Sequence, residues 1–582
     1  MAIIGIDLGT TNSLAAVWRN RRVELIPNAA GDFLTPSAVS VDDDGSILVG
    51  RTAKERLVSR PDRSAAGFKR DMGTGRRFHL GECAFTPEDL SSFVLRSLKE
   101  DAERYLNETV TEAVISVPAY FAERQRAATK RAATLAGLHV ERLINEPSAA
   151  VIAGEGVREG EQKTALVFDF GGGTLDVSLV EMFDNVVSVT AVSGDVRLGG
   201  RDFDLAIARA FCQECGLEWN RLSQRQRGNL LYQAERCKMA LSDREPVIMS
   251  MMDDEISASL ILTSEWLIRK CGPLFRRMTA PVRKVFFDAG LPPAELDELI
   301  MVGGSSRMPT VRSYISRFLK KRPTRKYPPD TAVARGVGVC AGMKERCEEL
   351  RDLILTDICP FTLGVNVISP SEPGRMLMSP IIERNSALPT SRTGLYSTTR
   401  DNQDKVEIKI YQGENRYCAD NAYLGKMELS VPPAPAGEQS VRIRFTYDIN
   451  GLFEAEAVND IGERARLLLR DGDMTEQELH SRLEELQKLK LPPREQAANR
   501  EVAALGERLY ASTVGQTRYQ VGRMLDWFQA QLGTQDPIRI AKARREATRF
   551  FEQAEADLSD AEWPDEGSAE NFWEYDAPEK EP

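Results

Sequence analysis

Histidine is scarce in this 582-residue chain, which contains only His79, His139 and His480. Residues so few and so far apart give little support to a histidine-rich metal site or to a catalytic triad built on histidine. Long hydrophobic runs are also missing, since none reaches the ~18 residues that suggest a membrane span. The N-terminus has neither a basic segment nor a small-residue cleavage site. We therefore expect a cytoplasmic protein that is not inserted in a membrane.

The nine cysteines are an odd number scattered from Cys83 to Cys418, which indicates reduced thiols and not a disulfide framework. Cys212 and Cys215 have the spacing of redox and zinc sites, but no second pair completes a tetrahedral zinc site. They stand in a helical pattern, so we interpret them as buried thiols. The net charge of −11 lacks the basic excess that a broad nucleic-acid surface needs. We expect no nucleic-acid partner.

The length and the changing sequence patterns indicate several domains. Over residues 1–350, short β-rich runs alternate with helical patterns, as in layered α/β proteins. An apolar connector follows at 351–357, and residues 358–469 alternate with period 2 between Gly and Asn turns, which predicts an antiparallel β domain. Residues 470–560 predict helices because Glu, Arg, Gln, Leu and Ala recur at helical spacing. The acidic residues 561–582 predict a disordered tail.

An internal repeat links two parts of the α/β region. Residues 4–11 are Ile-Gly-Ile-Asp-Leu-Gly-Thr-Thr, and residues 167–174 are Val-Phe-Asp-Phe-Gly-Gly-Gly-Thr. Each is an apolar strand that ends near an aspartate and turns through glycine and threonine toward a second strand. The copies are too far apart for a solenoid repeat. The pattern indicates a duplicated domain folded as two facing halves.

These paired turns have the composition of a polyphosphate site. Small residues let backbone N–H groups converge on an anion, and threonine hydroxyls add donors. Asp7 and Asp169 would then stand near the phosphates, where a carboxylate is useful only through a cation. Mg²⁺ is the natural bridge, held in part through water. The alternative is two ordinary glycine hairpins capped by aspartate, which the matching positions of the two turns make less favoured.

A third glycine turn, Gly-Gly-Ser-Ser-Arg at 303–307, follows the apolar run 299–302. Its glycines permit the close approach of a flat ring, and Ser305 or Arg307 could meet a base or ribose. The chain has no Walker A Gly-Lys-Ser/Thr, which disfavours a P-loop enzyme. The three glycines at 336–342 miss the dinucleotide-binding spacing and lie in a helical pattern, so we interpret them as positions of close helix packing.

Further motifs in a fixed order make a family resemblance specific. Over roughly residues 2–560 the chain resembles DnaK-type chaperones of the heat-shock protein 70 family. The short stretch between Lys69 and Pro118, and the phrase at 354–360, resemble the HscC-type branch of that family. The motifs that carry the resemblance are Gly5–Ser13, Phe68–Arg70, Val117–Phe121, Ile144–Pro147, Asp169–Thr174, Leu198–Asp204 and Val302–Gly304.

The resemblance implies an actin-like α/β ATPase domain over 1–350, with two lobes around a nucleotide cleft. An interdomain linker (351–357), an antiparallel β-sandwich peptide-binding domain (358–469) and an α-helical lid (470–560) would follow. The implied cofactors are ATP or ADP with Mg²⁺. The implied partners are extended client polypeptides, a J-domain co-chaperone and a nucleotide-exchange factor.

Lys69 matches the family's lysine that positions the attacking water, although from spacing alone it could equally be a solvated cation beside Arg70. Met239 stands where some relatives have an arginine that stacks on the base. The remaining matched residues form three sets: Glu146, Thr174 and Asp176 around Mg²⁺ and water; Gly9, Thr10, Thr11, Asn12, Gly171, Gly172 and Gly173 at the phosphates; and Glu235, Lys238, Ser242, Gly303, Gly304, Ser305 and Arg307 at the adenosine.

In the second half the resemblance implies a peptide pocket and a coupling segment. Without the family match the alternating apolar residues would be plain core. The linker is apolar where a flexible linker would be polar, so it could dock in one state and be released in another. The pocket residues are Val365, Tyr396, Val406 and Ile408, with Ile368 and Thr399 in an arch over the peptide. The coupling residues are Leu353, Ile354, Leu355 and Asp357 of the linker, Arg142 as the partner of Asp357, and Arg126 and Lys130 in the region addressed by the J-domain.

The leading expectation is an ATP-driven chaperone in which ATP opens a peptide site and hydrolysis closes it. One alternative is an actin-like-fold kinase acting on a small molecule, for which a peptide-binding β domain has no use. Another is a scaffold that binds nucleotide without hydrolysis, against which Lys69 and Thr174 argue.

Overall fold

The computed structural model describes residues 2–154, 162–183, 186–252, 256–324, 326, 328–350, 353–368, 374–449, 451–469, 493–534 and 536–559. They form two compact units. The first holds nearly all described residues up to 469, and the second holds those from 493 onward. The first part of the predicted lid, 470–492, and the predicted tail, 561–582, lie outside the described residues. Within the described part, no helix is long and apolar enough to cross a membrane.

The first unit begins with a mixed sheet whose centre is the apolar strand β1. Ile4 and Ile6 of this strand are completely buried. The sheet order is β11-β10-β1-β2-β3. β1 and β11 each pair with β10 in parallel, whereas β1–β2 and β2–β3 are antiparallel. The strand bounds are β1 Ile3–Asp7, β2 Asn12–Arg19, β3 Arg22–Ile26, β10 Glu112–Val117 and β11 Leu143–Asn145.

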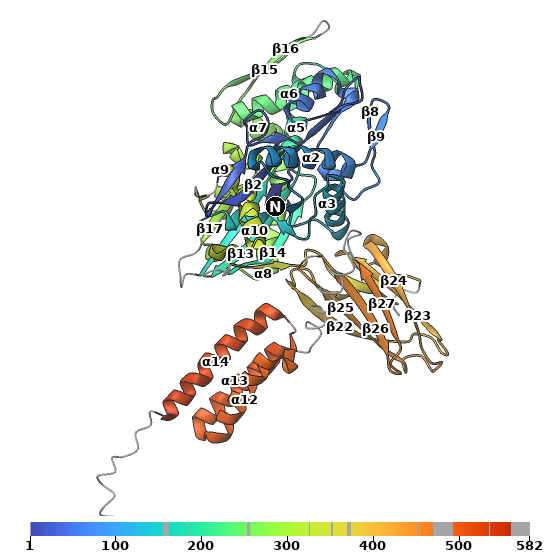
Figure 1. Ribbon diagram of the computed structural model, residues 1–582, viewed down its shortest axis with the longest axis vertical. Helices are drawn as coiled ribbons and strands as arrows, with labels where there is room; N and C mark the ends of the chain where they lie inside the picture. The colour runs from blue at the N-terminus through green and yellow to red at the C-terminus, as the bar shows by residue number, and fades with distance from the viewer. Residues whose placement is uncertain are drawn as a thin grey trace, which may run out of the picture. The chain divides into compact units, whose positions relative to one another are not determined.

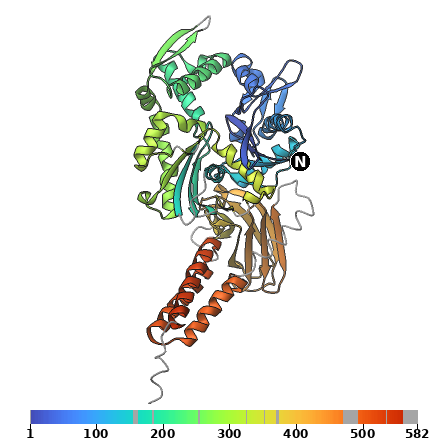
Figure 2. The same cartoon turned by 60° about the vertical axis from the view of Figure 1, so that its left-hand side comes forward.

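A second sheet repeats this arrangement. Its order begins β17-β12-β13-β14, with β12 and β17 parallel and the two hairpin pairs antiparallel. β10-β1-β2-β3 in the first sheet has the same order and directions. The predicted duplication is therefore confirmed, and Figure 2 shows the blue elements around β1 and the green elements around β12 as two lobes side by side. The strand bounds are β12 Gln162–Phe170, β13 Leu175–Phe183, β14 Val186–Asp195 and β17 Glu298–Val302.

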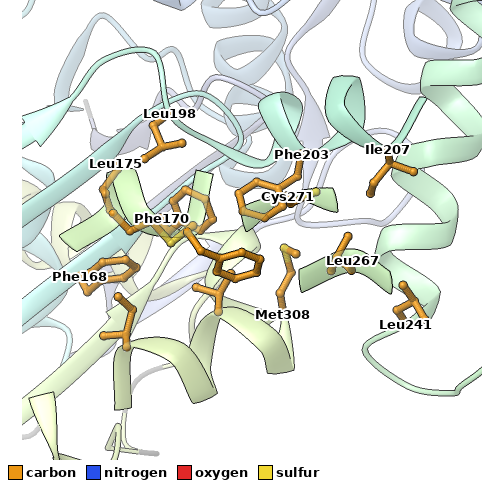
Figure 3. Packing of buried hydrophobic residues seen from close by; sticks show 14 of the residues in the cluster. Phe168, Phe170, Leu175, Leu198, Phe203, Ile207, Leu241, Leu267, Cys271 and Met308 are labelled. Carbon is orange, nitrogen blue, oxygen red and sulfur yellow. The ribbon is translucent and has the colours of Figure 1, made fainter. Parts of the chain in front are cut away.

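Helices cover both sheets. In the first lobe they are α1 Arg51–Ser59, α2 Pro87–Leu106 and α3 Glu123–Leu135, and in the second they are α5 Gly200–Glu214, α6 Gln224–Ala240, α7 Ser264–Lys270, α8 Gly272–Ala289 and α9 Pro309–Leu319. In the second lobe four phenylalanines anchor the core between sheet and helices. The rings of Phe170 and Phe203 lie 5.9 Å apart, and those of Phe203 and Phe275 lie 5.3 Å apart, both nearly perpendicular. Figure 3 shows Phe168, Phe170 and Phe203 within this cluster. This packing fixes the start of α5 beside the turn that follows β12.

α10 (Ala332–Lys344) packs against α4 (Glu146–Ile152) and against the first sheet. An added Cβ at Gly336 would lie 2.7 Å from the Cα of Ala149, and one at Gly342 would lie 2.5 Å from Cγ of Trp18. No side chain fits in either space. The interpretation of these glycines as helix-packing positions is confirmed.

The remainder of the first unit is an antiparallel β-sandwich, as expected for this region. Its two sheets have the orders β20-β19-β23-β24 and β22-β25-β26-β27. Both contribute to one core, in which Ile410 and Phe445 are completely buried. The strand bounds are β19 Leu363–Ile368, β20 Met376–Ile382, β22 Thr390–Ser397, β23 Lys405–Gln412, β24 Ala422–Ser430, β25 Ser440–Tyr447, β26 Phe453–Asn459 and β27 Arg464–Leu469.

Among its described residues the second unit contains three α-helices, which lie side by side in Figure 1. They are α12 Ala497–Ser512, α13 Gly515–Gly533 and α14 Pro537–Ser559. Leu509, Val521, Phe528 and Phe551 are almost completely buried between them. The helical prediction for this region is confirmed, whereas its role as a lid stays a prediction.

Candidate functional site

The two repeated turns meet each other across the lobes. An added Cβ at Gly172 would overlap the hydroxyl of Thr11, and one at Gly173 would overlap the side chain of Thr10. Only glycine allows this approach, which explains the residue type at the second turn. A cavity of about 400 Å³ opens between the turns. The two copies of the repeat, which are far apart in the sequence, are thus brought to one place.

Nearly all residues predicted for the nucleotide line this cavity. It is lined by Asp7, Gly9, Thr10, Thr11, Asn12, Lys69, Glu146, Asp169, Gly171, Gly172, Thr174, Glu235, Lys238, Ser242, Gly303, Gly304, Ser305 and Arg307. Two predicted residues lie just behind its wall. Asp176 pairs in register with Asp169 on the neighbouring strand, and Gly173 packs under Gly199. Their roles stay predictions.

Buried acidic side chains gather at the phosphate end of the cavity. Burial, and after it the nearby charge of Glu146, raises the pKa of Asp7 to about 6. The same two causes raise the pKa of Asp176 to about 7 and that of Asp169 well above its usual value. Ser116 donates a hydrogen bond of 2.9 Å to Asp7. Carboxyl groups packed in this way favour a bound cation.

The charge of Lys69 acts on all three of these aspartates and opposes the rise of their pKa values. Its Nζ lies 2.9 Å from Oε1 of Glu146, and the two side chains are 5% and 9% exposed. The 3₁₀ turn Phe68–Asp71 holds it, after Gly67, whose backbone is left-handed at φ 75°. Lys69 is therefore a buried, paired cation and not the solvated one that its spacing also allowed.

The cavity suits a magnesium polyphosphate. Oγ1 of Thr11 is buried and has no hydrogen-bond partner among the residues that the structure describes, so it can donate to an anion at the turn. Oxygen ligands from Asp7 and Asp169 are the kind that Mg²⁺ takes, and when bound Mg²⁺ would neutralise phosphate charge. No three metal-ligating side chains converge on one point within the described residues.

At the other end of the cavity, ion pairs hold the side chains predicted for the adenosine. Lys238 lies 2.6 Å from Asp204, Arg307 lies 2.6 Å from Asp330, and Glu235 pairs at 2.9 Å with Lys54 of the first lobe. Met239 is 61% exposed beside them. A flat apolar ring can contact the Met239 thioether here.

Sequence reasoning missed the partners in these pairs. Lys54–Glu235 joins the two lobes, and so does Arg70–Asp202, at 2.5 Å. Arg70 and Asp202 stood inside quoted motifs, but nothing in their spacing indicated that they meet. Arg201, beside Asp202, also lines the cavity and had no predicted role.

The predicted peptide-pocket residues lie in and around the core of the β-sandwich. Val365 and Ile408 are 1% and 3% exposed, while Val406 and Tyr396 are partly buried against the same core. Tyr396 has its hydroxyl 3.2 Å from that of Ser379. The two predicted arch residues, Ile368 and Thr399, are exposed.

Residues 351 and 352 of the predicted linker lie outside the described residues, and residues 354–357 belong to a strand, β18 (Ile354–Ile358), instead of a free connector. β18 adds in parallel to β14 of the second sheet and pairs with the short strand β21 (Ala387–Leu388) of the sandwich region. Leu353 and Leu355 pack against the core of the α/β region, while Ile354 is 55% exposed. An apolar linker can therefore be stable as part of this sheet.

Asp357 ends the linker in a buried polar cluster. It accepts a hydrogen bond of 2.5 Å from Asn145, whose own Oδ1 accepts one from Arg126. Burial raises the pKa of Asp357, and the charges of Arg126 and Arg142 oppose that shift. Arg126 and Lys130 also line a small cavity of about 30 Å³ beside Asp357. Four of the predicted coupling residues, Arg126, Lys130, Arg142 and Asp357, thus lie together.

Direct contacts join the sandwich to the α/β region. Arg384 binds Asp288 of α8 at 2.6 Å, and the Tyr447 hydroxyl donates a hydrogen bond of 2.7 Å to Glu123 of α3. The rings of Tyr120 and Phe361 lie 4.6 Å apart. Sequence reasoning predicted none of these contacts.

A comparison with known families places this arrangement. A family model described as Hsp70 protein matches residues 3–80 and 76–524, which is nearly the whole chain. The match agrees with the two-lobed α/β fold, the β-sandwich and the cavity of paired turns. The chain belongs to the Hsp70 family.

Proposed function

We propose that the protein is an ATP-driven chaperone that binds and releases extended apolar segments of unfolded proteins. Membership of the Hsp70 family supports a chaperone function in general, as well as binding of ATP or ADP with Mg²⁺ and of client polypeptides. The observation that carries the finer proposal is the linker strand. β18 belongs at once to the sheet that carries Asp169 and to the chain entering the β-sandwich.

Hydrolysis in this proposal depends on positioning and charge, because phosphoryl transfer needs little covalent help from the protein. Lys69 orients the attacking water and stabilises charge that develops on the terminal phosphate. Glu146 fixes the ammonium group of Lys69 at 2.9 Å. Thr174 and Asp176 hold water at the acidic end, and Asp7 and Asp169 are the residues that would hold Mg²⁺.

Coupling in this proposal runs through β18. While the strand is paired with β14, Asp357 is held by Asn145 and the sandwich is held by Arg384 and Tyr447. Release of the strand would break these contacts together, so nucleotide state and peptide affinity would change as one equilibrium. Arg126 and Lys130 are the proposed contact for a J-domain co-chaperone. A nucleotide-exchange factor, the lid role of α12–α14 and the HscC-type branch are further parts of the proposal.

Client binding is proposed at the edge of the sandwich core. A backbone-paired peptide needs one pocket for an aliphatic side chain, and Val406 is a partly buried residue at that core.

Val406→Phe should fill the pocket and weaken peptide binding about tenfold or more, since the peptide side chain then loses its burial. Basal ATP hydrolysis should not change. Fluorescence anisotropy of a labelled apolar peptide measures the effect, with Lys405→Phe on the opposite face of β23 as the matched control. Unchanged peptide affinity would count against this pocket.

A steady-state ATPase assay tests the whole proposal. Slow ATP hydrolysis that rises with unfolded peptide, together with faster peptide release in ATP than in ADP, is the expected result. Stimulation by a sugar with transfer of the phosphoryl group would instead support the kinase. Nucleotide binding without any hydrolysis would support the scaffold.

A further inference from the structure

Four cationic side chains line the nucleotide cavity, and three of them are already paired. Lys69 lies 2.9 Å from Glu146, Lys238 lies 2.6 Å from Asp204, and Arg307 lies 2.6 Å from Asp330. The fourth is Arg201. Its guanidinium makes no hydrogen bond or ion pair with any of the residues that the structure describes.

The backbone of Arg201 is fixed to the phosphate turn. Arg201 is the second residue of α5, and its N–H donates a hydrogen bond of 3.0 Å to the carbonyl oxygen of Gly172. The N–H of Gly200 donates likewise to Gly171, also at 3.0 Å. Any anion held by this turn therefore lies within reach of the Arg201 side chain.

The side chain of Arg201 crosses from the second lobe to the first. Its Cζ lies 2.6 Å from the position that a Cβ on Gly67 would take. Gly67 stands two residues before Lys69, the proposed hydrolytic residue. The guanidinium thus lies between the glycine turn of the second lobe, to which its backbone is bonded, and the segment of the first lobe that carries Lys69.

The acidic neighbours of Arg201 are each committed to another cation. Asp202 binds Arg70, Asp204 binds Lys238, and Glu235 binds Lys54. Although the side chain can meet water in the cavity, burial by surrounding protein lowers the pKa of Arg201, and the like charge of Arg70 lowers it further. A guanidinium keeps its charge under such conditions. A bound anion would therefore compensate the charge of Arg201 and stabilise this arrangement.

We infer that Arg201 is an additional phosphate-binding residue, whose guanidinium contacts oxygens of the ATP and ADP phosphate chain and closes the cavity from the second lobe. The inference rests on the proposed function and extends it, because the phosphate contacts of that proposal come from the two turns, Lys69 and the metal. A guanidinium is well suited to the task, since its fixed N–H groups match phosphate oxygens.

Binding measurements on Arg201 variants test the inference. Because a charge-assisted hydrogen bond is involved, Arg201→Ala should weaken ADP and ATP binding about 10- to 100-fold in Mg²⁺ buffer. Adenosine, measured by competition with fluorescent ADP, should bind as it does to the wild type. Arg201→Lys should recover part of the loss. Arg209→Ala removes an equal charge from the same helix, where Arg209 lies over Trp219, and should bind both ligands normally.

Each outcome separates this inference from the proposed function. Wild-type protein that binds no ADP would overturn both. Wild-type ADP binding with an unchanged Arg201→Ala variant overturns only the phosphate role. Equal losses for ADP and adenosine would also overturn it, because they would indicate a structural role in holding the lobes. A thermal unfolding midpoint for each variant identifies misfolding, and Arg201→Gln provides a second test at nearly constant volume.

Discussion

Lys69 is the residue that the family resemblance assigns to ATP hydrolysis and that the structure places in a buried ion pair with Glu146. Lys69→Ala should leave ATP affinity largely unchanged, because the two glycine turns and the adenosine end remain. Single-turnover hydrolysis should fall by about 100-fold or more, the scale seen when one preorganised charge is lost from a transition state. Quenched-flow measurement with labelled ATP checks this. Lys99→Ala, at a partly exposed position of α2 outside the cavity, is the control. Hydrolysis at the wild-type rate in Lys69→Ala would remove the proposed role.

Asp176 carries a prediction about pH. Its pKa is raised by burial, then by Glu146, to about 7 in the folded nucleotide-free protein, above the ordinary 3.8. The folded state therefore binds more protons than the unfolded state between these values, and the free energy of unfolding falls as pH rises. The contribution of Asp176 is complete below about pH 4 and is lost as pH rises through about 7.

Asp176→Asn removes this titration. Relative to wild type, the variant should gain about 1–3 kcal/mol in free energy of unfolding between pH 5 and pH 8. Urea unfolding in EDTA without nucleotide measures it. Asp62→Asn, at an exposed position, should show no such gain. If the difference in free energy of unfolding between Asp176→Asn and the wild type does not change with pH, the raised pKa is disproved.

Arg201 marks the limit of sequence reasoning at this scale. The motifs predicted which residues line the cavity, because their glycines and aspartates follow one another along the chain in an order that is specific to the resemblance. The sequence did not predict the ion pairs, because residues such as Arg70 and Asp202 are far apart in the chain and meet only in the folded arrangement of the two lobes. An unpaired Arg201 becomes visible only when the partners of Asp202, Asp204 and Glu235 are known.

At the scale of elements, the glycines of α10 that pack against neighbouring backbone and side chains leave little room for a larger residue. Gly336→Ala should destabilise the first unit by about 1–3 kcal/mol, the usual cost of overpacking, because the new Cβ meets the backbone of Ala149. The preference of alanine for helices, about 1 kcal/mol, would not offset it. Urea unfolding measures the change. Gly272→Ala at the start of α8 is the control, since its nearest neighbour would be 3.7 Å away, and equal stabilities would contradict the packing argument.

Strands and helices were predictable where periodicity is strong. The duplicated hairpins were found from their residues, because each apolar strand ends near an aspartate and a glycine turn. The linker was predicted as an apolar segment able to dock, but not as β18. Its five residues give no periodic signal, and the strand exists only because the edge of β14 is open to pair with it. Tertiary context decides such short elements.

For the molecule as a whole, the important property is that the nucleotide site and the sandwich share one structure through β18 and a few polar contacts. Most of these contacts are single hydrogen bonds, and each is modest in energy. Arg384 differs because it binds two partners. It contacts Asp288 at 2.6 Å and 3.1 Å, and it contacts Glu414 at 2.9 Å. The side chain of Asp288 is only 5% exposed.

Arg384→Ala should therefore loosen the sandwich more than any other single exchange at this contact. It leaves Asp288 buried without its cation, and loss of one partner of a buried pair costs about 3–5 kcal/mol. If docking of the sandwich is how ATP speeds peptide release, the acceleration of release by ATP over ADP should fall about tenfold or more. Stopped-flow release of a fluorescent peptide measures it. Arg442→Ala, an equal charge loss on an exposed face of β25, should release peptide as the wild type does. Full acceleration in Arg384→Ala would mean that nucleotide state reaches the peptide by another route than this contact.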